Sequence, residues 1–258
     1  TLRCNAYTAI GDGFVLYMVL TKNTQVERAG NHMKTLKFGI EIELTGITRE
    51  QASKVIGAYF GTESSYTGGA YHAYEAKDSK GRTWKAVYDA SIDPEKRVNG
   101  TRVAADNEYK TEVVSPILTY EDIEDLQELV RQLRHKGAIA NASCGIHIHV
   151  GAERFRPQTL RNIVNIIASK EDILYKALKI DPQRLRYCKK TNEKLLETIN
   201  RKKPDTMAQL ADIWYAEDPI DRTRHYNNTR YHGLNLHATF TKGTVEFRLY
   251  VQKIVMCS

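Results

Sequence analysis

The sequence lacks the cysteine patterns that mark several classes of functional protein. It has only four cysteines, Cys4, Cys144, Cys188 and Cys257, and no two of them form a C-x-x-C pair. The spacing therefore gives no support to a zinc ribbon, and it fits a protein of a reducing compartment.

Several catalytic loops are also missing. No G-x-x-x-x-G-K-[ST] stretch is present, which excludes a P-loop nucleotide site, and there is no G-x-S-x-G nucleophile elbow. None of the cysteines has the local context of a family-specific nucleophile. The pair Gly68-Gly69 is too short to cradle phosphates, and we interpret it as a turn.

Long hydrophobic runs are absent as well. The segment from Phe14 to Leu20 is apolar for only seven residues, far short of the roughly 20 that a membrane-spanning helix needs. The Gly-Asp-Gly before it argues against a signal peptide. We therefore expect a cytoplasmic protein that does not partner with a membrane. Residues 1–33 contain one candidate strand and a polar stretch, and we interpret them as an N-terminal extension or linker before a domain at 34–258.

Basic residues outnumber acidic ones, with a net charge of +7 over 258 residues. This excess favours anionic partners such as nucleotides or nucleic acid, although a basic surface without a partner has the same composition. Aromatic and basic residues do not interleave on any predicted strand, as a platform for stacking bases requires, so nucleic acid is the less favoured partner.

The sequence does contain a clear alternation of apolar and charged residues from Leu36 to Leu44. Side chains of a strand point alternately to its two faces, so Glu41 and Glu43 share one face while the aliphatic residues share the other. Two adjacent carboxylates repel each other and are tolerated on a wet face or around a cation.

The same pattern recurs in three further segments. His147 and His149 share a face within 144–150, Glu246 and Arg248 share one within 244–250, and Glu112 opposes Thr111 and Val113 within 109–116. One such strand is typical of a solvated sheet face. Four of them predict a single sheet whose apolar side packs on helices and whose polar side holds a metal-dependent site.

Helical periodicity appears between and after these segments. Thr48-Arg49-Glu50-Gln51 predicts a capping box, and Gly61 predicts the end of the helix behind it. Thr119 and Pro157 predict the starts of two more helices, and two others are expected at 192–201 and 207–215. Segments 71–76, 80–89 and 109–114 have the character of hairpin strands, with a turn at 78–81. This order predicts an α+β fold with a mainly antiparallel sheet.

The polar residues of the four strands offer oxygen and nitrogen ligands. Such a carboxylate-rich set suits Mg²⁺ or Mn²⁺ completed by substrate phosphates, and its members are Glu41, Glu43, Glu112, His147, His149 and Glu246. Arg248 forms either an ion pair with them or a fork for an anionic group. Zinc-dependent hydrolysis through His147 and His149 is an alternative, although it leaves the glutamates under-used.

Taken in order, these segments resemble the signature series of the amidoligase family, which comprises carboxylate–amine ligases related to glutamine synthetase and glutamate–cysteine ligase. The resemblance rests on 38–43, 112–116, 145–150 and 246–248, supported by 84–92 and 230–235. Each motif is weak alone, but the ordered set is fairly specific and runs from about residue 35 to residue 250.

The resemblance implies a fold and a reaction. The fold would be a curved, mainly antiparallel sheet of the glutamine-synthetase type, with helices on one face. ATP would phosphorylate a carboxylate of an amino acid or peptide, and an amine would displace the phosphate to form an amide.

The resemblance also implies roles for particular residues. Arg248 would stabilise the transferred phosphoryl group, Asp89 would orient or deprotonate the amine, and Asn235 would bind substrate. His147 and His149 would ligate metal or touch the nucleotide. The metal set would be Glu41, Glu43, Glu112, His147 and Glu246.

The C-terminus departs from the family pattern. Relatives continue past the Glu-x-Arg strand into further helices, whereas this sequence ends eight residues after Tyr250. We therefore expect a C-terminally truncated catalytic domain. The alternative function is that of a degenerate or truncated protein that binds nucleotide and metal without catalysis.

Overall fold

A computed structural model describes residues 34–219, 221–224 and 226–251 of the chain. The candidate strand within residues 1–33 lies outside these residues. Among the described residues, no helix is long and apolar enough to cross a membrane. Cys144 and Cys188 are buried free thiols.

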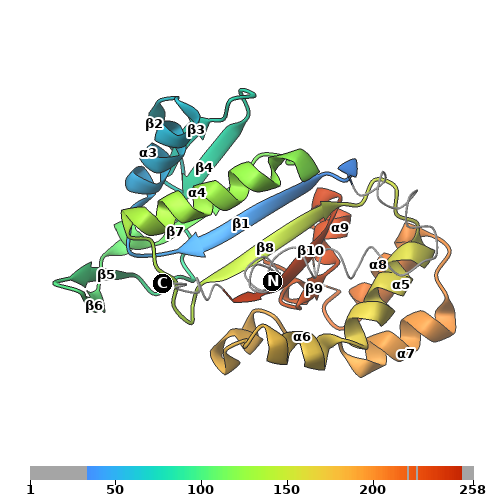
Figure 1. Cartoon of the computed structure of the whole chain (residues 1–258). Helices are drawn as coiled ribbons and strands as arrows, with labels where there is room; N and C mark the ends of the chain where they lie inside the picture. Colours follow the sequence, from blue (N-terminus) through green and yellow to red (C-terminus); the bar gives the residue numbers. More distant parts are fainter. Residues whose placement is uncertain (1–33, 220, 225, 252–258) are drawn as a thin grey trace, which may run out of the picture.

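An eight-stranded sheet in the order β2-β3-β4-β7-β1-β8-β10-β9 forms the centre of the structure (Figure 1). Every pairing of neighbouring strands is antiparallel. The strands are β1 Phe38–Leu44, β2 Ser64–Gly68, β3 Ala73–Lys77, β4 Thr83–Val87, β7 Thr111–Val114, β8 Gly145–Gly151, β9 Leu234–Asn235 and β10 Thr244–Val251.

The first two helices begin and end at the expected signals. Helix α3, Arg49–Phe60, has the capping box between Thr48 and Gln51 and ends at Gly61 in the left-handed conformation. Helix α4, Ile123–Lys136, follows a short 3₁₀ helix, Tyr120–Asp122, whose N-cap is Thr119.

The remaining helices lie between β8 and β10. The predicted ones are α5 Pro157–Ala168, α7 Glu193–Lys202 and α8 Met207–Trp214, while α6 Glu171–Ala177 and α9 His237–Lys242 lack a clear sequence signal. A 3₁₀ helix, Pro182–Arg186, connects α6 to α7, and two others cover Asn107–Tyr109 and Asn228–Arg230.

The hydrophobic core forms where the helices cover the apolar face of the sheet. In one cluster, residues of α3 and α4 pack on β1, β4 and β7; in the other, residues of α5 to α8 pack on β8 and β10. Figure 1 shows these two groups of helices over the two halves of the sheet. The prediction of an α+β fold with a mainly antiparallel sheet is confirmed, and the charged face of the central strands lies opposite the helices.

Several elements differ from the sequence-based expectation. Strand β2 and a separate hairpin, β5 Glu95–Val98 with β6 Thr101–Ala104, were not expected. The three hairpin segments are also shorter than predicted. Their flanking residues include turns and a 3₁₀ helix with local hydrogen bonds, such as those from Gly81 N–H to the Asp78 carbonyl and from Lys110 N–H to the Asn107 carbonyl.

Candidate active site

The sheet register places the charged residues of four strands in one group. Residues directly opposite each other on antiparallel strands share a face. The cross-strand pairs on the polar face are Glu43 with Glu112, Glu41 with His147, Glu246 with His149, and Glu246 with Asn235.

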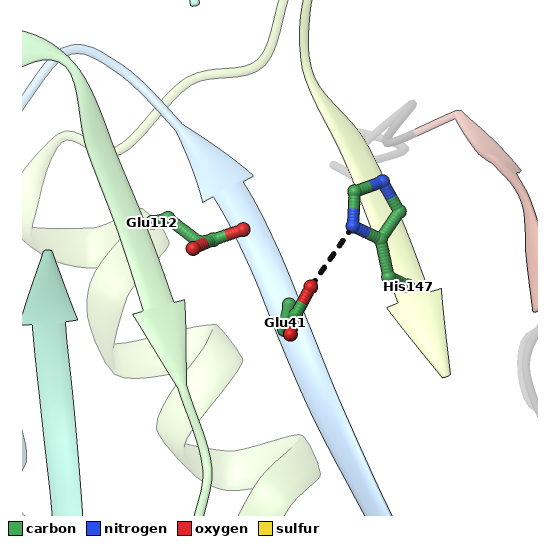
Figure 2. Close-up of side chains that lie close together, drawn as sticks. All are labelled: Glu41, Glu112 and His147. Carbon is green, nitrogen blue, oxygen red and sulfur yellow. Dashed lines mark hydrogen bonds and ion pairs between the residues drawn. The ribbon is translucent and has the colours of Figure 1, made fainter. Parts of the chain in front are cut away.

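Ligand atoms of these residues come close enough to surround cations. Three overlapping triads each have ligand atoms within 4.8 Å of one another: Glu41, Glu112 and His147; Glu41, His149 and Glu246; Glu43, Asp89 and Glu112. Figure 2 shows the first triad, in which side chains from β7, β1 and β8 turn toward one another. The structure thus adds Asp89 to the carboxylate group.

Glu41 lies between the two imidazoles. His147 Nδ1 is 3.1 Å from Glu41 Oε2, and His149 Nε2 is 3.3 Å from Glu41 Oε1. Burial raises the pKa of the Glu41 carboxyl, but the hydrogen bonds and charge of His147 and His149 outweigh it and hold the pKa well below its usual value.

Glu112 is in the opposite situation. Burial, together with the negative charges of Glu41, Glu43 and Asp89, raises the pKa of the Glu112 carboxyl well above its usual value. Glu112 also lies directly opposite Glu43 in the sheet, an arrangement that destabilises the fold when both are charged. A cation between the carboxylates would remove this conflict.

Glu246 is held by protein groups on both sides. Asn235 Nδ2 donates to its Oε2 at 2.6 Å, and Arg248 Nη1 donates to its Oε1 at 2.6 Å. Burial raises the pKa of Glu246, but Arg248 and the imidazoles lower it to about 2. Asn235 Oδ1 accepts a hydrogen bond from the His237 backbone N–H at 2.8 Å. Both polar atoms of the Asn235 amide are therefore hydrogen-bonded, which fixes the side chain that holds Glu246.

Arg248 lies on the polar face with Glu246, two residues before it, as the alternation along the strand predicts. A β-bulge lies beside it, because β10 has one residue more between Phe247 and Tyr250 than the paired part of β8, and such bulges are frequent next to active sites. Arg248 Nε donates to the Tyr187 carbonyl at 3.3 Å. Burial lowers the pKa of Arg248, but Glu246 and Glu43 raise it above the ordinary value.

Arg184 is a member of the site that the sequence pattern does not reveal. It lies on the 3₁₀ helix between α6 and α7, is 2% exposed, and places Nη1 3.3 Å from Glu43 Oε2. The backbone N–H of Gly145 donates to the same oxygen at 2.6 Å. Only long-range folding brings Arg184 to the sheet, so local periodicity contains no signal for it.

The donor set fits divalent cations. His147 Nε2 and His149 Nε2 are buried and form no well-aligned hydrogen bond with the described residues, although Glu43 Oε1 lies 3.5 Å from the first and Glu41 Oε1 lies 3.3 Å from the second. Buried polar atoms of this kind normally have a partner. Carboxylates with imidazole nitrogens are a chemistry that Mg²⁺ and Mn²⁺ accept, and a cation would supply the missing partner for the imidazoles.

Comparison with known proteins identifies the family. A family described as "Putative amidoligase enzyme" matches residues 34–251. No curated protein and no solved structure matches the chain significantly. Because the matched region covers most of the chain and includes every residue of the carboxylate group, the chain belongs to the amidoligase family.

Proposed function

We propose that the protein is an ATP-dependent ligase that joins a carboxylate of an amino acid or peptide to an amine. The observation that carries the proposal is the group of four glutamates and two imidazoles on one sheet face, which Asp89 joins from the segment after β4. Family membership supports a ligase, and we extend it to a sheet of the glutamine-synthetase type.

The cation-holding residues would be Glu41, Glu43, Glu112, His147 and Glu246. His149 completes the triad with Glu41 and Glu246. Asp89 completes the triad with Glu43 and Glu112. When bound, divalent ions would neutralise the phosphates of ATP and draw them toward the sheet. Glu246 is well suited to this role because Asn235 and Arg248 already hold its carboxylate in one orientation.

The reaction would proceed in two displacements. A carboxylate oxygen of the substrate attacks the terminal phosphorus of ATP, and ADP leaves. The amine nitrogen then attacks the acyl carbon, and phosphate leaves. Arg248 would stabilise charge on the transferred phosphoryl group, His147 and His149 would contact the nucleotide, and Asp89 would accept the proton of the amine.

ADP release tests this proposal. We expect ADP and phosphate to form only when Mg²⁺ or Mn²⁺, an amine and a suitable carboxylate from a panel of amino acids and peptides are all present. Glu246→Gln should weaken the metal dependence by removing a ligand charge, while Glu121→Gln, at an exposed position, should behave like wild type.

The outcomes separate the competing functions. Binding of Mg-ATP without amide formation for any member of the panel would favour a non-catalytic nucleotide binder. Zinc-dependent cleavage of a peptide without ATP would favour a hydrolase. Either result would contradict the ligase.

A further inference from the structure

Arg184 uses only one end of its guanidinium on protein groups. Nη1 donates to the Ser143 carbonyl and contacts Glu43 Oε2 at 3.3 Å. Nε is buried and forms no hydrogen bond, and Nη2 forms none with any described residue. Nε and Nη2 make up one edge of the guanidinium, so a complete two-donor edge lacks a partner.

This unpartnered edge lies on the charged face of the sheet. Gly145, at the start of β8, shares that face with His147. A Cβ at Gly145 would lie 2.1 Å from Arg184 Nη2, which is closer than two such atoms approach, so the guanidinium would have to move away. The absence of a side chain at Gly145 therefore lets the guanidinium lie directly over the strand, beside Glu43.

Arg248 does not offer an edge of this kind. Its Nη1 is committed to Glu246 and its Nε to the Tyr187 carbonyl. Of the two arginines that contact the glutamates, Arg184 is thus the one with adjacent free donors. A carboxylate or phosphoryl group accepts two parallel hydrogen bonds from such an edge, and lysine does not reproduce them.

We propose that the Nε–Nη2 edge of Arg184 binds an oxyanion with two neighbouring oxygens. The anion is a carboxylate of the substrate or a phosphoryl group next to Glu43. This inference rests on the proposed function for the origin of the anion, but the binding itself does not require turnover. Arg184 would thereby be a second anion-binding residue beside Arg248.

Calorimetric titration of the whole chain with succinate and with inorganic phosphate, without ATP, tests the proposal. Wild type should bind at least one of these anions, and Arg184→Lys should bind it about tenfold more weakly or worse, although the charge is retained. The matched control is Arg186→Lys, because Arg186 is exposed on the same 3₁₀ helix and lies over the Tyr187 ring. The control should bind like wild type.

A second variant and a second readout guard against a folding defect. Gly145→Ala keeps Arg184 but displaces its guanidinium, and it should also weaken anion binding. In wild type, the Nε–H NMR resonance of Arg184 should shift when the anion is added. Preference for phosphate would assign the edge to the phosphoryl group, and preference for succinate would assign it to a substrate carboxylate.

Equal affinities of wild type and Arg184→Lys for both anions would overturn the proposal. So would the absence of binding by wild type at millimolar concentrations of both. Failure of the ligase proposal has a different signature, since it would abolish ADP release without affecting these titrations.

Discussion

At the scale of single residues, alternation along a strand is the strongest source of prediction. Because side chains repeat every two residues, the sequence predicts that Glu41 and Glu43 share one face, and the register places them beside Glu112 and His147. Two features could not be predicted this way. The bulge at Arg248 depends on the pairing of β8 with β10, and Arg184 reaches the site from a distant 3₁₀ helix.

A prediction at this scale concerns Arg248→Lys. The variant keeps the charge but loses the planar fork that donates to Glu246 and Tyr187. If Arg248 stabilises the transferred phosphoryl group, kcat should fall about 100-fold, while ATP binding should change little. Steady-state kinetics and nucleotide titration measure the two effects. Arg154→Lys, at an exposed position, is the control, and unchanged turnover in Arg248→Lys would reduce Arg248 to a structural ion pair.

At the scale of elements, caps and turns were predicted better than edge elements. Thr48 and Gly61 mark α3 through local hydrogen bonds and a left-handed residue, which the sequence specifies directly. Strand β2 has no apolar alternation, and its middle residues are exposed at the sheet edge, so only pairing with β3 defines it. The hairpin β5–β6 is likewise mostly exposed. Since neither of its faces is buried, its sequence shows no alternation of apolar and polar residues.

The cap of α3 provides one prediction. Thr48→Ala removes the acceptor for the backbone N–H of Gln51 and should lower the free energy of unfolding by about 1 kcal/mol. Urea unfolding measures the loss. Thr62→Ala, just beyond α3, is the comparison, because its hydroxyl binds Lys77 in an exposed position and should matter less. Equal losses in the two variants would contradict the capping role.

A charged cluster joins the start of α4 to the β3–β4 turn. The Asp122 carboxylate accepts hydrogen bonds from both Nη atoms of Arg82 at 2.9 Å and from Lys80 Nζ at 2.7 Å. Asp122 is only 2% exposed. These contacts, above all the hydrogen bonds from Arg82, hold the pKa of Asp122 well below its usual range. Since the native pKa is depressed, the stabilisation is present above the unfolded pKa of about 3.9 and is lost as the pH falls toward the native value.

Asp122→Asn should therefore destabilise the protein by about 2 kcal/mol at neutral pH. The difference from wild type should shrink as the pH falls below about 3.9. Urea unfolding at several pH values measures both effects, with Glu121→Gln as the neighbouring control. A difference that stays constant with pH would show that the charge of Asp122 contributes nothing.

At the scale of the whole molecule, one face of the sheet forms the hydrophobic core and the other face carries the charged site. Helices pack on the apolar face and supply the core, while the other face gathers carboxylates that repel one another. Glu112 carries much of this conflict, because neighbouring charges raise its pKa. A folded protein with such a face is less stable without a cation than its core alone would allow, and it should respond strongly to a ligand that binds only the native state.

Thermal melts with Mg²⁺ and ATP test this coupling. At one hundred times the dissociation constant, the ligand should add about 2.7 kcal/mol to the free energy of unfolding, which corresponds to a rise in Tm of about 5–10 °C for a domain of this size. Glu112→Gln removes a carboxylate that belongs to two of the three triads and whose pKa is raised by burial and by the neighbouring negative charges. The melting temperature of this variant should therefore rise without ligand, while its response to Mg-ATP shrinks. These two opposite changes distinguish a cation site from an ordinary ion-pair network, in which removing Glu112 would lower stability and leave the response to Mg-ATP intact. A wild-type Tm that does not move with millimolar Mg-ATP would contradict both the cation site and the nucleotide.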